Sequence, residues 1–304
     1  MNSLYNKELS SSKRIEILSS NSWIKIVNKE IQAKAINSLE QGKLLLFPEL
    51  KVNTSDKEMK LLTNVTIEPG SKNISYDYHT KQIRGSQDSQ EKKKLLTKIL
   101  ARYVEHATAL INNHFPQYIS KLQVGRASLR PVEIEGRVNP SYRKDDTRLH
   151  VDAFPSSPNQ GRRILRVFSN INPEGKPRIW RLGEDFMHVS KYFFPKIHAP
   201  IPGLAWLMET FKITKGRRTA YDHYMLNIHN KMKYDLTYQN TATSEIIHIP
   251  ANSSWVVFSD QVSHAALSGQ HMLEQTFYLP IDAMVDSAIS PVKVLEKLAG
   301  KQLT

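Results

Sequence analysis

The chain of 304 residues contains 42 Lys and Arg against 29 Asp and Glu, for a formal net charge of +13, and it contains no cysteine. Without cysteine there can be no disulfide, thiolate zinc site, iron–sulfur cluster or cysteine nucleophile, so any metal must be held by His, Asp or Glu. The basic charge is typical of proteins with an anionic partner, such as nucleic acid, an acidic membrane surface or a phosphorylated substrate, although a soluble protein can also be basic without one.

Residues 1–20 lack the apolar segment of a signal peptide. The longest apolar stretches, such as residues 201–208, are far shorter than the ~18–20 residues of a membrane-spanning helix. We therefore expect a cytoplasmic protein that is at most peripherally attached to a membrane.

The N-terminal part reads as helices and one strand. Apolar periodicity predicts a helix at residues 28–41, followed by Gly42 as the C-capping glycine. Residues 43–48 predict a buried strand stopped by proline, and the polar residues 52–90 predict loops. A second, longer helix is expected at residues 89–114, where the apolar residues recur every four positions: Leu95, Ile99, Tyr103 and Ala107.

From about residue 122 short runs of β-branched and aromatic residues alternate with turn residues, a pattern typical of a sandwich or jelly-roll barrel. The predicted strands are 122–128, 132–138, 148–154, 164–171, 246–249, 254–259 and 274–279. A helical insertion at about 186–238 contains predicted helices 186–194 and 221–236, and a last helix is expected at 290–298. We expect a mainly β fold with flanking helices: a double-stranded β-helix (jelly-roll) core at 121–304, with residues 1–120 packed on it as part of one domain.

The first candidate for chemistry is the segment His150-Val151-Asp152. On a strand, His150 and Asp152 project from the same face with Cα atoms about 6.5–7 Å apart, so both can bind one metal. Chance alone predicts roughly one His-x-Asp/Glu in this composition, but apolar flanks and a strand-like context favour a site. A third ligand would complete the 2-His-1-carboxylate triad of non-haem Fe(II) oxygenases.

His264 is the predicted third ligand, because it follows the strand 254–259 and precedes a run of small residues. The other histidines fit less well. His223 and His229 are six positions apart on a predicted helix, which places them on different faces.

Oxygenases of this kind normally use 2-oxoglutarate, whose distal carboxylate requires an Arg or Lys. The usual place, ten or eleven residues after the last histidine, holds Glu274 and Gln275 here. Arg166 is the alternative anchor; it lies in the strand after His-x-Asp, on the same predicted face as Phe168. On the residues alone, a salt bridge from Arg166 to a nearby carboxylate is an equal alternative.

At this point the sequence resembles a known family, the bacterial Kdo hydroxylases. The strongest block is residues 141–155, which read SYRKDDTRLHVDAFP. Further blocks are 160–168, 170–173, 214–218, 221–223, 258–265 (FSDQVSHA) and 273–280 (LEQTFYLP), with weaker similarity at 47–50 and 72–75. The resemblance extends from about residue 35 to the C-terminus.

The resemblance implies an Fe(II)/2-oxoglutarate-dependent dioxygenase that uses O2 to hydroxylate C3 of Kdo (3-deoxy-D-manno-oct-2-ulosonic acid) in lipopolysaccharide, giving the acid Ko. The acceptor would be Kdo on lipid A or its precursor, at the anionic inner face of the inner membrane, and an assay would include ascorbate. By family pattern His150, Asp152 and His264 would bind iron. Arg166 would anchor 2-oxoglutarate, and Arg130 is a further candidate.

Two other functions remain open from the residues alone. The first is an Fe(II)/2-oxoglutarate oxygenase that acts on nucleic acid, although no nucleic-acid module is recognisable and no such partner is expected. The second is a non-enzymatic barrel that binds an acidic sugar or a lipid headgroup without iron.

Overall fold

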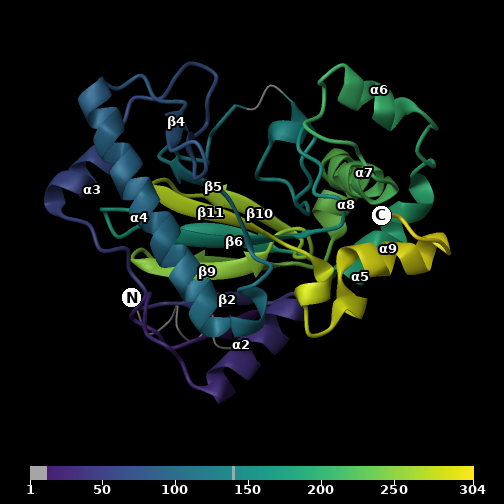
Figure 1. Cartoon of the computed structure of the whole chain (residues 1–304), viewed down its shortest axis with the longest axis horizontal. Coiled ribbons are helices and arrows are strands. Elements are labelled where there is room, and N and C mark those ends of the chain that lie inside the picture. The colour runs from purple at the N-terminus through teal and green to yellow at the C-terminus, as the bar shows by residue number, and fades with distance from the viewer. Residues whose placement is uncertain (1–11, 139–140) are drawn as a thin grey trace.

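Two β-sheets occupy the centre of the computed structural model, which describes residues 12–138 and 141–304 (Figure 1). In the larger sheet the strands follow the order β1 (Ile15–Ile17), β2 (Leu44–Phe47), β9 (Ser253–Phe258), β6 (Arg163–Asn170), β11 (Met272–Leu279), β5 (Gln123–Arg130), β3 (Ile74–Asp77) and β4 (Gln82–Arg84). The smaller sheet has the order β10 (His264–Ser268), β7 (Arg178–Leu182) and β8 (Glu245–Ile249). Neighbouring strands are antiparallel, except that β1 and β2 are parallel.

Helices surround both sheets. The N-terminal part contributes α2 (Lys29–Glu40), α3 (Asp56–Thr63) and α4 (Gln90–His114), and α4 crosses one face of the larger sheet (Figure 1). The C-terminal part contributes α5 (Phe186–Phe193), α6 (Leu204–Thr210), α7 (Ala220–Tyr234), α8 (Leu236–Thr241) and α9 (Pro291–Ala299). None of the described helices combines the length and apolar character needed to cross a membrane.

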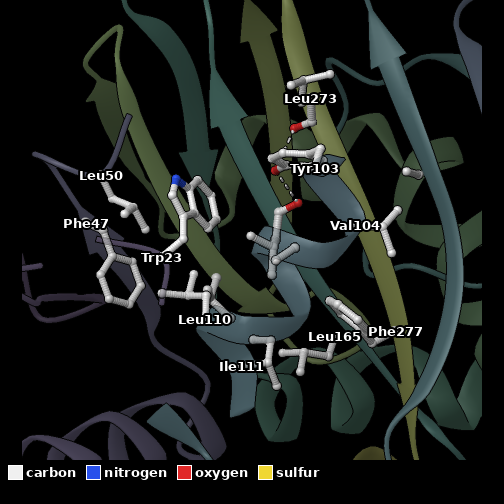
Figure 2. Packing of buried hydrophobic residues seen from close by; sticks show 14 of the residues in the cluster. Trp23, Phe47, Leu50, Tyr103, Val104, Leu110, Ile111, Leu165, Leu273 and Phe277 are labelled. Carbon is white, nitrogen blue, oxygen red and sulfur yellow. Dashed lines mark hydrogen bonds between the residues drawn. The ribbon is translucent and has the colours of Figure 1, made fainter. Parts of the chain in front are cut away.

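The largest apolar core lies between α4 and the larger sheet. Figure 2 shows Leu165 of β6 and Phe277 of β11 packed beside α4. The Tyr103 hydroxyl of α4 satisfies its hydrogen bonding inside this core, because it lies 3.2 Å from the Val167 carbonyl and 3.1 Å from Ser169 Oγ. The helix is thereby fixed to β6 by polar as well as apolar contacts.

A second core fills the space between the two sheets. Phe168 of β6 stacks on Trp255 of β9, with ring centroids 5.1 Å apart, and Trp180 of β7 packs edge-on against both. Phe168 thus faces the smaller sheet, whereas Leu165 faces α4. This alternation confirms the predicted faces of β6, and it directs Arg166 to the inner side, beside Phe168.

The predicted N-terminal helices and the strand between them are confirmed. The Asn28 side chain accepts a hydrogen bond from the Ile31 N–H at the start of α2, and Gly42 has the left-handed φ of 82° that suits a residue beyond a helix end. The predicted face of α4 needs one correction: Leu95 is 38% exposed, and Leu96 is the buried residue in that turn.

Five predicted strands are confirmed as β5, β6, β8, β9 and β11, and the three predicted C-terminal helices are confirmed as α5, α7 and α9. Three regions differ from the prediction. Residues 52–90 contain α3, β3 and β4 besides loops, and 132–138 contains turns without a strand. Residues 148–154 are not a full strand, since only His150 forms a bridge, to His264. The short elements β7, β10, α6 and α8 were not predicted from the apolar periodicity. Because of its long helices the described chain is mixed α and β, whereas a mainly β fold was expected.

Candidate metal centre and neighbouring cleft

His150, Asp152 and His264 lie together in the structure, with one potential ligand atom from each within 4.8 Å of the others. The main chains of His150 and His264 exchange two hydrogen bonds, with N···O distances of 3.0 and 2.9 Å. The Asp152 N–H donates to the carbonyl of Ser259, the residue directly after β9, at 2.8 Å. Hydrogen bonds between the two segments therefore assemble the triad that the sequence predicted.

Each imidazole is oriented by a main-chain carbonyl. The Nδ1 atom of His150 lies 2.8 Å from the Arg148 carbonyl, and Nδ1 of His264 lies 2.8 Å from the Val262 carbonyl. A carbonyl can only accept, so each Nδ1 carries the proton and each Nε2 presents a lone pair. For His150 that Nε2 lies 3.7 Å from Asp152 Oδ1.

The protonation states suit a divalent metal. Burial lowers the pKa of His150 well below its ordinary value, and it also lowers the pKa of His264, so both rings are neutral at pH 7. Burial would raise the pKa of Asp152, but the Arg166 guanidinium, the two imidazoles and a hydrogen bond from Ser259 together outweigh that effect, and the pKa is lowered. Two neutral imidazoles and one carboxylate are suitable donors for Fe(II).

Asp152 also has a carboxylate oxygen that is free to bind a metal. Its Oδ2 atom is buried and has no hydrogen-bond partner among the described residues. Arg166 Nη2 lies 3.2 Å from that oxygen, and the contact is an ion pair without hydrogen-bond geometry. An orphaned carboxylate oxygen in this position is consistent with a metal ligand.

Arg166 lies between two carboxylates. Besides Asp152, it contacts Glu274 of β11, with 3.1 Å between Arg166 Nη1 and Glu274 Oε1. Arg130 of β5 pairs with the other oxygen of the same glutamate. The salt bridge that the sequence left open is therefore present, and the position usually taken by a basic anchor holds a carboxylate that binds two arginines.

A cleft of about 990 Å³ opens beside this group, over the inner face of β3, β5 and β11. Arg166, Arg130 and Glu274 line it, whereas the three potential metal ligands do not. Arg166 links the cleft to the triad through its contact with Asp152, and its guanidinium also lies 5.5 Å from the centre of the Phe154 ring. Polar side chains line the remaining floor: Ser75, Asp77, Arg126, Ser128, Thr276 and Tyr278.

Two residues of α7 beside the triad were not predicted from the sequence. The His229 ring lies 5.3 Å from that of His150, edge to face, and burial lowers the pKa of His229 to about 4. Lys233 is almost fully buried, and its Nζ donates to the Arg143 carbonyl at 3.2 Å. The six-residue spacing of His223 and His229 places those two histidines on different faces of α7, whereas the four-residue spacing of His229 and Lys233 places these two on one face.

Trp180 of β7 was also missed. Its ring stacks on His264 at 5.1 Å, nearly parallel, and fixes the plane of that imidazole. The short strand Arg178–Leu182 carries arginines between its apolar residues and follows Pro177, so it gave a weak strand signal.

A fully buried ion pair supports the turn that leads into His264. Arg163 of β6 contacts Asp260 at 2.8 Å through Nε and donates to Gln261 Oε1 at 2.6 Å. The side chains of Arg163 and Asp260 have no exposed surface. The turn at residues 259–263 thus holds both His264 and, through the Ser259 carbonyl, Asp152.

Comparisons with known proteins agree with the sequence resemblance. The sequence profile of a family described as 3-deoxy-D-manno-oct-2-ulosonic acid (Kdo) hydroxylase matches residues 22–302. A search of curated proteins found no match.

Solved structures of the Kdo hydroxylase KdoO, described as a non-haem Fe(II) α-ketoglutarate-dependent dioxygenase, are also similar. The complex with α-ketoglutarate and Fe(III) is 46% identical, over 96% of this chain and 98% of that chain, with a TM-score of 0.92. The cobalt(II) complex is 47% identical, over 96% and 97%, with a TM-score of 0.93. The complex with succinate and Fe(III) has the same identity and coverage, with a TM-score of 0.90.

Proposed function

The chain belongs to the Kdo hydroxylase family, and from that premise we propose that it is an Fe(II)- and 2-oxoglutarate-dependent dioxygenase that hydroxylates C3 of lipid A-linked Kdo, giving Ko. The observation that carries the proposal is the buried group of His150, Asp152 and His264, whose donor atoms converge. Family membership favours a sugar acid over nucleic acid as the substrate, and the triad favours an enzyme over a barrel that only binds.

His150, Asp152 and His264 would hold the iron, two through Nε2 and one through a carboxylate oxygen. Bound Fe(II) supplies, with O2 and 2-oxoglutarate, the oxidant needed to hydroxylate an unactivated C–H bond. The protein fixes the ligands beforehand through the carbonyls of Arg148 and Val262, which set both imidazole tautomers. Prior orientation reduces the conformational entropy lost when the site is loaded.

Arg166 and Arg130 would receive the distal carboxylate of 2-oxoglutarate. Both line the cleft, and both are held by Glu274, which keeps two cationic side chains close together. Arg166 also contacts Asp152, so the proposed anchor lies directly beside a proposed iron ligand. Arginine can bind a carboxylate through two parallel hydrogen bonds, which would orient the cosubstrate as well as attract it.

The cleft would take the Kdo acceptor, because it is the large opening that leads to Arg166. Its serine, threonine and tyrosine hydroxyls can hydrogen-bond a sugar, and Arg126 and Lys215 add positive charge for the carboxylates and phosphates of the acceptor. These residues would bind and orient the sugar so that its C3 methylene faces the metal centre.

For the fold we propose that the two sheets are the two layers of a double-stranded β-helix. β5, β11, β6 and β9 would form one layer, and β8, β7 and β10, continued by the segment at His150, would form the other. We also propose that the N-terminal region and the core are one domain, since β1–β4 extend both edges of the larger sheet.

A direct assay tests the function. Purified protein would be incubated with Fe(II), 2-oxoglutarate, ascorbate and detergent-solubilised Kdo–lipid A, and mass spectrometry would look for one added oxygen on Kdo. His150→Ala should abolish this product without unfolding the protein, whereas the exposed His198→Ala should retain it. Full turnover by His150→Ala would refute the proposed metal site, and no product from the native chain would refute the reaction.

We propose, finally, that the enzyme works in the cytoplasm, peripherally bound to the inner face of the inner membrane. The net charge of +13 and a lipid-linked acceptor support this location.

A further inference from the structure

One helix of the insertion exposes its apolar side chains. α6 has the sequence Leu-Ala-Trp-Leu-Met-Glu-Thr, yet none of its residues is buried. Trp206 is 54% exposed, and Phe211, which follows the helix, is 72% exposed. Four further large apolar side chains in the same segment are exposed: Ile201, Leu204, Leu207 and Ile213. Figure 1 shows α6 at the upper right edge of the molecule, beyond α7.

Six large apolar residues within a stretch of thirteen are too concentrated to be scattered surface residues. A soluble protein usually buries such residues or uses them to bind a partner. Aromatic and aliphatic side chains together on an exposed helix are typical of elements that insert into the interfacial region of a bilayer.

The charges around this segment identify the partner. Residues 196–218 contain five basic residues and one acidic residue, Glu209. The basic residues are Lys196, Lys212, Lys215, Arg217 and Arg218. Positive charge beside exposed Trp and Phe complements a bilayer that carries anionic headgroups. A partner protein that bound α6 in an apolar groove would not require this excess of basic over acidic residues.

The same segment is joined to the cleft. The Lys215 N–H donates to the Ser156 carbonyl at 2.9 Å, and the Arg218 side chain donates to the Pro155 carbonyl. Arg218 also contacts the sulfur of Met208 in α6, at 3.6 Å. Pro155, Ser156 and Lys215 all line the cleft that leads to Arg166. Membrane contact at α6 would therefore bring the wall of this cleft to the lipid surface.

We propose that residues 201–213 form a membrane-docking surface that inserts Trp206 and Phe211 among anionic lipids, so that a lipid-linked acceptor reaches the cleft without leaving the bilayer. This inference rests on the proposed function for the identity of the acceptor. The binding of the surface to lipid is a separate property that can be measured without catalysis.

Vesicle flotation tests the surface. Native protein should float with vesicles of phosphatidylcholine and 30% phosphatidylglycerol (about 30% is a common anionic fraction in such assays), and it should bind phosphatidylcholine alone much more weakly. The double variant Trp206→Ser/Phe211→Ser should reduce partitioning into the anionic vesicles by about tenfold or more. Ile26→Ser is the matched control, because Ile26 is 76% exposed and precedes α2, far from α6 along the chain. It should float like the native protein.

Two further measurements separate the explanations. The double variant should hydroxylate Kdo–lipid A normally in detergent but lose at least about tenfold in rate when the acceptor is embedded in vesicles. Flotation equal to that of the native protein would overturn the proposal. The proposal would also be overturned if the native protein were a dimer in light scattering and the double variant a monomer, while both floated equally. The surface would then bind a second copy of the chain. If the native protein were inactive in detergent, the proposed function would be contradicted. The flotation result would still show whether residues 201–213 bind lipid.

Discussion

The buried pair of Arg163 and Asp260 allows a quantitative prediction. Arg163→Met leaves the Asp260 carboxylate without its cation in a place that has no exposed surface. Removing one partner of a buried ion pair costs about 3–5 kcal/mol. An unfolding entropy of about 2.1 cal/mol/K per residue gives about 0.64 kcal/mol/K for 304 residues. The melting temperature of the metal-free variant should therefore fall by about 5–8 °C.

The assay is thermal unfolding followed by circular dichroism at pH 8, with Arg84→Met as the matched control at an exposed position. The control should melt within about 1 °C of the native protein. The double variant Arg163→Met/Asp260→Leu should recover most of the loss, because no unpaired charge remains buried. An Arg163→Met variant that melts like the control, or a double variant that is worse than the single one, would refute the reasoning.

The same variant should depend on pH. Burial raises the pKa of Asp260, and Arg163 opposes that rise. Without the guanidinium the folded-state pKa rises further above the unfolded value, so folding favours the protonated carboxyl and loses stability as the pH rises through the folded-state pKa. The deficit of Arg163→Met should be smaller at pH 5.5 than at pH 8. Because the pair supports the turn before His264, Co(II) affinity should also fall, by about tenfold or more.

Two other predictions concern the site. Arg166→Ala should raise the KM for 2-oxoglutarate by about tenfold or more, since a carboxylate anchor would be lost; an unchanged KM in steady-state turnover would place the anchor elsewhere. The metal-free protein should lose stability as the pH falls below about 6.5, because burial lowers the folded-state pKa values of His114, His150 and His264 and the unfolded chain binds the protons more readily. A melting temperature that stays constant between pH 7 and pH 5.5 would contradict this reasoning.

The sequence predicted the elements whose local signals were strong. α4 has an N-capping serine and a long apolar stripe, and β2 is a continuous apolar run, so both were found. β10 begins with His-Ala-Ala and gains its stability from pairing with β7, which no local pattern reports. Elements with strong local signals could therefore be predicted, whereas β7 and β10, which depend on pairing across more than eighty residues of chain, could not.

The same distinction applies to the site. His150, Asp152 and His264 could be predicted because the residue types and spacing suit a metal, and the structure brings the three together. The resemblance also identified the family, which the profile match confirms. His229 and Trp180 could not be predicted as neighbours of the triad, because their contacts depend on how α7 and β7 pack on it. The roles of the three ligands and of Arg166 stay predictions.

The charges around Arg166 explain how the buried Arg166 and the partly exposed Arg130 can lie side by side next to the candidate metal centre. Arg130 and Arg166 carry two positive charges, and Asp152 and Glu274 carry two negative charges, so these four side chains are neutral as a group. A divalent cation alone would add two charges to a buried site, at a high cost in desolvation. A dianionic cosubstrate that followed it would restore neutrality. The arrangement therefore favours binding of the metal and 2-oxoglutarate together over binding of either one alone. A neutral residue at position 274 would remove one negative charge from this group without removing any of the three potential metal ligands.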